Sequence, residues 1–171
     1  MRTTVLFCAA MLAASPAALA KEKPPHAKAT IEARSGSAVK GEAHFKVDDG
    51  GVEMKIRVTG LTPGPHAVHL HEKGDCSAPD AATAGGHWNP TGAPHGKWGH
   101  ESKFHHGDIG NLVANAQGEA ELEFETTLWT IGGDPGTNVV GKSVVIHEKV
   151  DDFTTQPTGA AGARIGCGVI R

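Results

Sequence analysis

The sequence predicts an all-β protein, an eight-stranded antiparallel sandwich or flattened barrel with two long loops. Apolar and polar residues alternate over about eight short segments, which is the pattern of half-buried strands. Turn-forming residues separate these segments, and glycine contributes 23 of the 171 residues. No stretch has the apolar spacing of a long amphipathic helix, so we expect strands to build the core.

Each expected strand is bounded by a turn signal. The Asp48-Asp49-Gly50-Gly51 cluster favours a hairpin, because Asp and Gly tolerate positive φ. The hairpin leads into residues 52–58, where apolar side chains alternate with charged ones, and Thr62-Pro63-Gly64-Pro65 is the next turn. In chain order, the expected strands are 29–33, 39–47, 52–58, 67–71, 111–114, 120–124, 143–148 and 165–170.

Two long segments break the alternation and are expected to be loops. Residues 73–107 are rich in Gly, Pro, Asn and His, and residues 151–163 form a second irregular stretch. Loops longer than about 12–15 residues are uncommon inside a compact domain and usually carry function. We therefore expect functional side chains in these loops.

The first 20 residues have the features of a secretory signal peptide. Arg2 provides the positive charge, Val5–Leu19 is apolar, and Ala18-Leu19-Ala20 is a small-x-small cleavage signal. The apolar run is shorter than the roughly 20 residues of a membrane span. Cys8 follows the bulky Phe7, which is not the pattern of a lipidation signal. We expect cleavage near Ala20, one mature domain over residues 21–171, and a periplasmic or secreted protein without a membrane anchor.

The charge and cysteine content of the mature chain narrow the class of protein further. Without residues 1–20 the chain would carry 15 basic and 19 acidic side chains, and it has no basic stripe of the kind that binds nucleic acid. Two cysteines would remain, Cys76 and Cys167. An even count in an exported protein favours a disulfide over free thiols.

The most unusual feature of the composition is its 11 histidines, which points to metal binding or to pH sensing. His69 and His71 stand two residues apart on an expected strand, so their side chains project from the same face. His147 ends another expected strand. The first long loop supplies further candidates, and these are His87, His95, His105 and the nearby Asp108.

Imidazoles without thiolates suit copper(II) or zinc, and three histidines with one carboxylate can complete a four-coordinate zinc shell. By chemistry alone, either His105 or its neighbour His106 could be a ligand. The chain has no H-E-x-x-H motif, which a zinc protease would need. The remaining histidines are interpreted as ordinary surface or loop residues, and these are His26, His44, His66, His100 and His106.

Five ordered motifs cover much of the chain from residue 69 onward. They are HLHEKGDC at 69–76, GHWNP at 86–90, HHGDIGN at 105–111, VVIHEKVDD at 144–152 and AGARIGCGVI at 161–170. Together they resemble the copper–zinc superoxide dismutase family, and the resemblance extends over essentially the whole mature chain. It implies a Greek-key sandwich or flattened barrel in which the two long loops form the active site.

The resemblance also implies a role for each candidate residue. One copper ion would be held by His69, His71, His87 and His147, and one zinc ion by His87, His95, His105 and Asp108. His87 would thus bridge the two metals, and the H-x-G-D spacing of the family selects His105 over His106. Asp151 would hydrogen-bond a histidine from each site, Arg164 would guide the substrate, and Cys76 and Cys167 would form the disulfide.

The implied reaction is dismutation of superoxide to molecular oxygen and hydrogen peroxide, as an antioxidant defence outside the cytoplasm. The second loop has no Lys or Glu in residues 153–163, so Lys97 or Lys103 would have to supply any extra steering charge. The alternative is a non-catalytic periplasmic metal-binding relative, and a zinc-only enzyme is compatible with the same ligands. The oligomeric state stays open, with a homodimer as one option.

Overall fold

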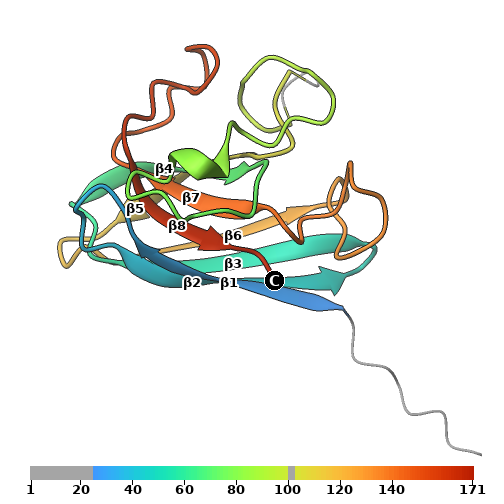
Figure 1. The fold of residues 1–171 in the computed structure, drawn as a ribbon, viewed down its shortest axis with the longest axis horizontal. Coiled ribbons are helices and arrows are strands. Elements are labelled where there is room, and N and C mark those ends of the chain that lie inside the picture. The colour runs from blue at the N-terminus through green and yellow to red at the C-terminus, as the bar shows by residue number, and fades with distance from the viewer. Residues whose placement is uncertain (1–24, 100–102) are drawn as a thin grey trace, which may run out of the picture.

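The computed structural model describes residues 25–99 and 103–171 and contains eight strands, one at each place where the sequence predicts one (Figure 1). The expected signal peptide lies outside the described residues. The strands are β1 (His26–Ala33), β2 (Lys40–Asp48), β3 (Gly51–Thr59), β4 (Gly64–His71), β5 (Asp108–Ala114), β6 (Ala120–Thr126), β7 (Ser143–His147) and β8 (Arg164–Val169).

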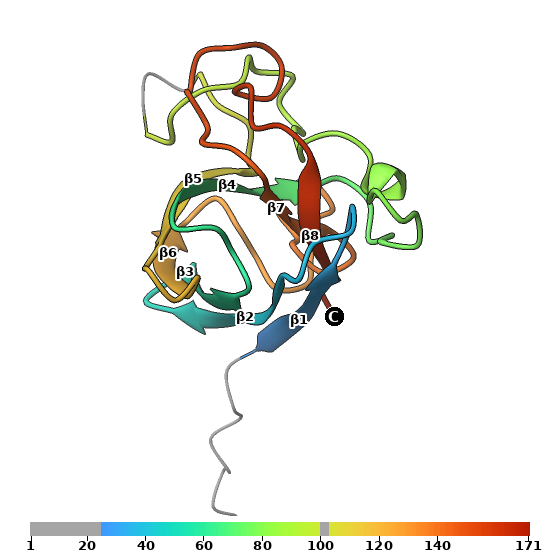
Figure 2. The ribbon, with the colours of Figure 1, turned by 90° about the vertical axis from the view of Figure 1, so that its left-hand side faces the viewer.

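The strands form one antiparallel sheet in the order β5-β4-β7-β8-β1-β2-β3-β6. The two strands at the ends of this order, β5 and β6, also contact each other, so the sheet curls into a nearly closed barrel (Figure 2). Strands far apart in the chain become neighbours, as in a Greek key, because β4 pairs with β7 and β8 pairs with β1. The predicted all-β barrel is confirmed.

Alternate residues of the strands fill the interior of the barrel. In β1 the burial pattern alternates as the sequence predicts, with Ile31 among the buried residues. In contrast, β7 is buried along its whole length and β4 from its third residue onward. The reason is visible in Figures 1 and 2, where the described parts of the two long loops, residues 72–99, 103–107 and 148–163, leave the barrel on the same side. One face of β4 and β7 therefore meets the core and the other meets the loops.

Several strand boundaries differ from the sequence prediction by one to three residues, and in β4 and β5 the cause is pairing between strands, which includes residues that look like turns. β4 begins at Gly64, which pairs with Ala114 of β5, and Pro65 pairs with Val113. β5 begins at Asp108 and not at Asn111. A short 3₁₀ helix, η1 (Ala82–Ala84), was not predicted, since three residues are too few to show a periodicity. Within the described residues, no helix is long and apolar enough to span a membrane.

Candidate metal centre

Strand pairing brings the first candidate ligands together. His69 and His71 project from one face of β4, and β7 runs beside this strand and ends at His147. The ladder is irregular next to both His69 and His147, where the register shifts. His71 also forms a single β-bridge with His87, which draws the first loop across the end of β4. Residues from three separate segments thus share one buried space.

Two groups of four side chains have ligand atoms close enough to hold a metal ion. The first group is His69, His71, His87 and His147, whose ligand atoms all lie within 4.8 Å of one another. Within it, His71 Nε2 and His147 Nε2 are 3.4 Å apart, and the ring centroids of His69 and His87 are 4.0 Å apart. All four residues are buried. This group is the copper set implied by the resemblance.

The second group overlaps the implied zinc set. It contains His69, His87, His95 and Asp108, again within 4.8 Å. His105 stands against the same atoms, with Nδ1 3.3 Å from His87 Nδ1 and 3.2 Å from Asp108 Oδ1. The Nε2 of His69 is hydrogen-bonded to the carboxylate of Asp151, so only its Nδ1 is available to an ion. His69 can therefore be a ligand in only one of the two groups.

Unpaired ring nitrogens show that these groups fit metal ions. His69 Nδ1, His87 Nε2 and His95 Nδ1 are buried without a hydrogen-bond partner. His95 Nδ1 is 3.0 Å from Asp108 Oδ2, yet without the geometry of a hydrogen bond. Buried polar atoms are rarely left unpaired, and converging lone pairs around one point are what an ion satisfies. Four imidazoles suit copper or zinc, and three imidazoles with one carboxylate suit zinc.

Asp151 connects the two groups. Its Oδ2 accepts a hydrogen bond from His69 Nε2 at 2.8 Å, and its Oδ1 accepts one from His95 Nε2 at 2.9 Å. Both rings therefore carry their proton on Nε2 and present the lone pair of Nδ1 to the groups described above. The backbone of Asp151 is held in turn by Asn111 of β5, through bonds of 2.7 and 3.0 Å.

Burial and the neighbouring carboxylates set the protonation of the site. Burial lowers the pKa of His87 to about 4 and holds the pKa values of His71 and His147 below their usual range. Burial also lowers the pKa of His95, but the adjacent carboxylate of Asp108 and the hydrogen bond to Asp151 outweigh that effect and raise the pKa to about 9. The pKa of Asp108 is lowered in spite of burial, by hydrogen bonds from surrounding histidines. The site thus has neutral imidazoles at His71, His87 and His147 and an ionised carboxylate at Asp108, whereas the raised pKa of His95 favours a second ring proton that a bound ion would displace.

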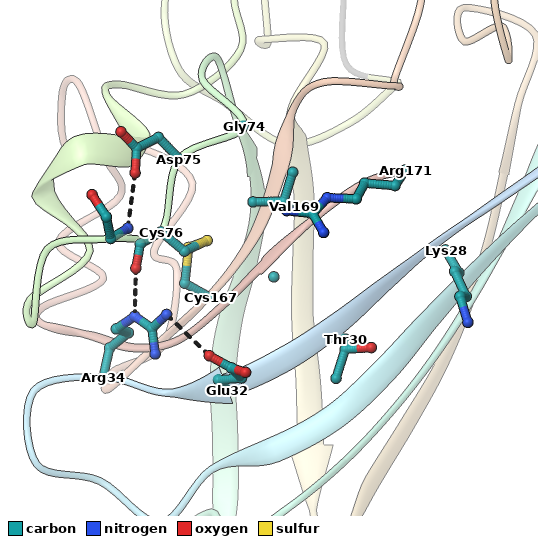
Figure 3. A pocket seen from close by; sticks show the side chains of 12 residues that line it. Lys28, Thr30, Glu32, Arg34, Gly74, Asp75, Cys76, Cys167, Val169 and Arg171 are labelled. Carbon is teal, nitrogen blue, oxygen red and sulfur yellow. Dashed lines mark hydrogen bonds and ion pairs between the residues drawn. A yellow bond between two sulfur atoms is a disulfide. The ribbon is translucent and has the colours of Figure 1, made fainter.

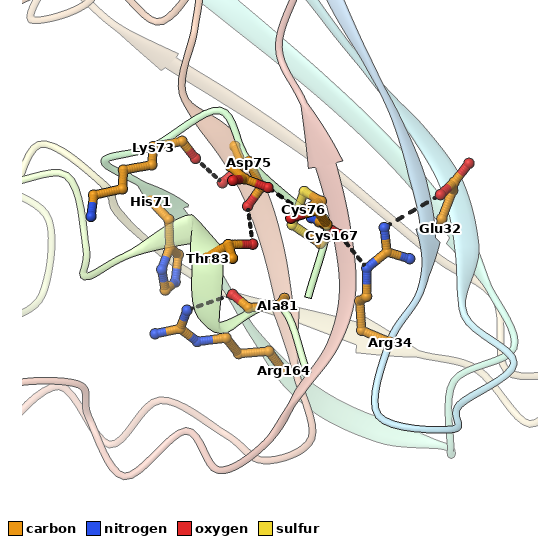
Figure 4. Close-up of a disulfide and its surroundings, with 12 residues drawn as sticks. Glu32, Arg34, His71, Lys73, Asp75, Cys76, Ala81, Thr83, Arg164 and Cys167 are labelled. Carbon is orange, nitrogen blue, oxygen red and sulfur yellow. Dashed lines mark hydrogen bonds and ion pairs between the residues drawn. A yellow bond between two sulfur atoms is a disulfide. The ribbon is translucent and has the colours of Figure 1, made fainter. Parts of the chain in front are cut away.

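Arg164 reaches the edge of the first group. Its Nη1 donates a hydrogen bond of 2.8 Å to the carbonyl oxygen of Ala81, beside η1 (Figure 4). The guanidinium is near enough for its charge to lower the pKa values of His71 and His147. The pocket lined by Arg164 also includes Asp80 and Gly162.

The expected disulfide joins Cys76 to Cys167, and it ties the segment before η1 to β8 (Figure 4). The Nε of Arg34 donates to the carbonyl oxygen of Cys76 at 2.9 Å, and Arg34 also pairs with Glu32 (Figure 3). A pocket between β1, β8 and this segment is lined by Lys28, Arg171 and others, and by none of the histidines of the two groups.

The interpretation of the remaining histidines was wrong for His66. It is buried on β4, and its Nδ1 donates to the main-chain carbonyl of His147 at 2.9 Å. The sequence predicts His66 to be an ordinary surface or loop histidine, but it becomes part of the strand because β4 pairs with β5 from Gly64 onward. His26 and His44 are exposed, His106 stacks edge-on against Trp88, and His100 lies outside the described residues.

Sequence reasoning also missed Gln156, whose side chain bonds to the backbone of His95 from the second loop. An isolated Gln in an irregular segment gives no signal in the sequence. Lys97, a candidate for steering, has its ammonium 6.0 Å from the centroid of the Phe153 ring.

Residues 39–170 match the family model described as copper/zinc superoxide dismutase. The chain belongs to the copper/zinc superoxide dismutase family. Membership in this family makes the protein an oxidoreductase of the superoxide dismutase class, with copper and zinc as its metals. The two groups of histidine and aspartate side chains are able to hold both ions.

Similar proteins from several organisms support this membership. The chain is 42% identical over 126 residues to a copper–zinc superoxide dismutase of Caulobacter vibrioides, an alignment that covers 71% of this chain and 72% of that protein. It is 39% identical over 140 residues to an extracellular superoxide dismutase of Drosophila melanogaster, covering 77% of this chain and 75% of the relative. The enzyme of Deinococcus radiodurans is 34% identical over 181 aligned positions, which cover 99% and 97% of the two chains.

Solved structures share the superoxide dismutase fold. The clock protein EA4 superposes with a TM-score of 0.75 at 34% identity and covers 88% of this chain and 96% of its own. A double mutant of a SOD-like protein from Bacillus subtilis gives a TM-score of 0.74 at 36% identity, with coverage of 82% and 94%.

Proposed function

We propose that this protein dismutes superoxide at a copper site that shares His87 with a zinc site, outside the cytoplasm. Two superoxide anions and two protons give one molecule each of oxygen and hydrogen peroxide. In this proposal His69, His71, His87 and His147 hold copper, and His87, His95, His105 and Asp108 hold zinc. When bound, copper supplies one-electron redox chemistry and zinc supplies a fixed positive charge.

The orientation of the His87 ring carries the proposal. Its Nδ1 lies 2.9 Å from Asp108 Oδ1 and 3.3 Å from His105 Nδ1, on the side of the zinc set. Its Nε2 is buried without a partner, and the rings of His69 and His71 stand 4.0 and 5.1 Å away by their centroids. A single imidazole with one nitrogen toward each ligand set is what a shared ligand requires.

Other side chains complete the chemistry. His87 Nε2 can hold a proton whenever it is not bound to an ion, which is useful in a reaction that consumes protons. Arg164 offers a permanent cation beside the copper set, where an anionic substrate must approach. Asp151 keeps the rings of His69 and His95 in the tautomer that binds metal.

Metal analysis and a superoxide-disproportionation assay on the purified protein test the proposal together. One copper and one zinc per chain are expected, with catalytic activity. In His147→Ala, copper and activity should be lost while zinc is kept. Full occupancy of both metals without activity would overturn the proposal in favour of a non-catalytic metal-binding relative.

Export is proposed on separate grounds. Residues 1–20 have the pattern of a signal peptide, the chain contains a disulfide, and the Drosophila relative is named extracellular. N-terminal sequencing of the protein from the periplasm or medium of an expressing bacterium should give a mature chain that starts at Lys21. Recovery of uncleaved chain in the cytoplasm alone would contradict this.

A further inference from the structure

The side chain of Gln156 makes a reciprocal pair of hydrogen bonds with the backbone of His95. The His95 N–H donates to Gln156 Oε1 at 2.8 Å, and Gln156 Nε2 donates to the His95 carbonyl at 2.8 Å. The two residues belong to different loops and are 61 positions apart. The pair therefore connects the second loop to the first at the position of a proposed zinc ligand.

The contacts around His95 leave one atom free. Its N–H and its carbonyl are taken by Gln156, and its Nε2 is taken by Asp151. The next residue, Gly96, donates its N–H to Asp108 Oδ2 at 3.1 Å. Only Nδ1 has no partner, and it is aimed at Asp108. The backbone and ring of His95 are thus fixed so that a single lone pair points into the proposed zinc site.

All three hydrogen bonds to His95 come from one short segment, residues 151–156. Asp151 at its start is itself held to β5, through the reciprocal pair with Asn111. Asn111 and Gln156 act in the same way, since each side-chain amide binds both the N–H and the carbonyl of one residue. The first pair fixes the segment to the barrel, and the second fixes His95 to the segment.

Gln156 is exposed to solvent, so it fills no space in the core. An exposed glutamine that served only solubility would have no reason to make two short bonds to one distant residue. The contact needs no charged side chain, because a neutral amide is sufficient for it, and residues 153–163 contain no Lys or Glu.

We infer that Gln156 is a positioning residue that holds zinc in the protein, by fixing the backbone of His95 from the second loop. This inference rests on the proposed function, since it takes His95 as a zinc ligand. Loss of two hydrogen bonds to the ligand-bearing backbone is expected to accelerate zinc release about ten-fold.

The test measures zinc release from the purified holoenzyme to a chromogenic chelator, for the parent protein, Gln156→Ala and Gln156→Glu. Gln156→Ala should release zinc about ten-fold faster. Gln156→Glu should fall between the two, because a carboxylate can accept from the His95 N–H but cannot donate to its carbonyl. Gln117→Ala, in the exposed turn between β5 and β6, is the matched control and should behave as the parent does.

A second readout separates positioning from a general loosening of the loop. With Co²⁺ in the zinc site, the visible spectrum reports ligand geometry, and Gln156→Ala should broaden or weaken its bands while Gln117→Ala leaves them unchanged. Equal zinc release and identical Co²⁺ spectra in the parent protein and Gln156→Ala would overturn the inference while the proposed function stands. A parent protein that holds no zinc would overturn both.

Discussion

The Nδ1 of His66 and the main-chain carbonyl of His147 are joined by a buried hydrogen bond of 2.9 Å. The His66 ring also lies with Nε2 2.9 Å from the carbonyl oxygen of Thr62. The ring therefore connects the beginning of β4 to the end of β7, next to a proposed copper ligand. This contact is formed by a side chain that the sequence predicts only as an ordinary surface or loop histidine.

Replacement of His66 by alanine should destabilise the fold and weaken copper binding together. The change leaves a cavity and an unpaired carbonyl at His147, and we expect a loss of about 2–4 kcal/mol in the free energy of unfolding. Urea unfolding of the metal-free protein and a copper competition titration measure the two effects. His44→Ala, on the exposed face of β2, is the control and should change neither. Unchanged copper affinity in His66→Ala would argue against the role of this bond.

Asp151→Asn should weaken the metal site without removing a ligand. An amide cannot accept a strong hydrogen bond from both His69 and His95, so at least one ring loses its fixed orientation. Loss of such a contact typically costs about 10–100-fold in metal affinity or activity. Metal titration and the dismutation assay measure the effect, with the surface variant Asp48→Asn as the control. Wild-type affinity for both metals in Asp151→Asn would contradict the prediction.

The disulfide should stabilise the fold and should also hold Arg164 in position beside the copper set. It links residues 91 positions apart, and closure of such a loop contributes about 4–5 kcal/mol in the chain-entropy model. The double variant Cys76→Ser with Cys167→Ser should lose roughly that amount in urea unfolding. Its dismutation rate should fall as well, because Arg164 is anchored to Ala81 in the tied segment. A dismutation rate equal to that of the parent protein would show that the disulfide is not needed to position Arg164.

Arg164→Gln should slow the reaction most at low ionic strength. The substitution removes the cation beside the copper set, and one charge acting over a short distance changes the rate by about ten-fold. Rate constants measured over a series of salt concentrations should also show a flatter dependence in the variant. Arg57→Gln, on the outer face of β3, is the charge-matched control, and a similar loss of rate there would refute a local role for Arg164.

Asp152 should make the stability of the fold depend on pH in the acid range. Hydrogen bonds from Thr155, and then from Thr154, lower its pKa to about 2. Because the folded pKa is depressed, this contribution is present above the usual aspartate pKa near 4 and is lost as the pH falls toward about 2. The difference in the free energy of unfolding between the parent protein and Asp152→Ala, measured without metal by urea unfolding, should therefore shrink as the pH falls from about 5 to about 2. A constant difference over this range would show that the carboxylate is not involved.

Much of the fold could be read from the sequence because alternation of apolar residues is a local property. The expected strand at 52–58 lies within β3, and the one at 29–33 lies within β1, since each has a face that must be buried. Residue 64 could not be assigned to a strand, because its partner Ala114 is 50 positions away. η1 and the burial of both faces of β4 depend on loops whose course has no periodicity.

The candidate ligands could be named from the motifs, but their geometry could not. The spacing of the family favours His105 over His106, and the structure turns His105 toward Asp108 and His106 toward Trp88. The family motifs assign His69 to the copper set alone, and its place beside His87, His95 and Asp108 in the second group was not predicted. The roles of individual ligands in copper or zinc binding remain predictions that the experiments above test.

The sequence by itself determined the number of strands and their positions along the chain, the cysteine pair and the set of histidines available to a metal site. These follow from local periodicity and from residue chemistry, which do not require knowledge of distant contacts. Only the tertiary structure decided which ring nitrogen faces which group. That choice depends on partners far apart in the chain, such as Asp151 for His69 and Gln156 for His95, and these meet only after β4, β7 and the two loops have packed together.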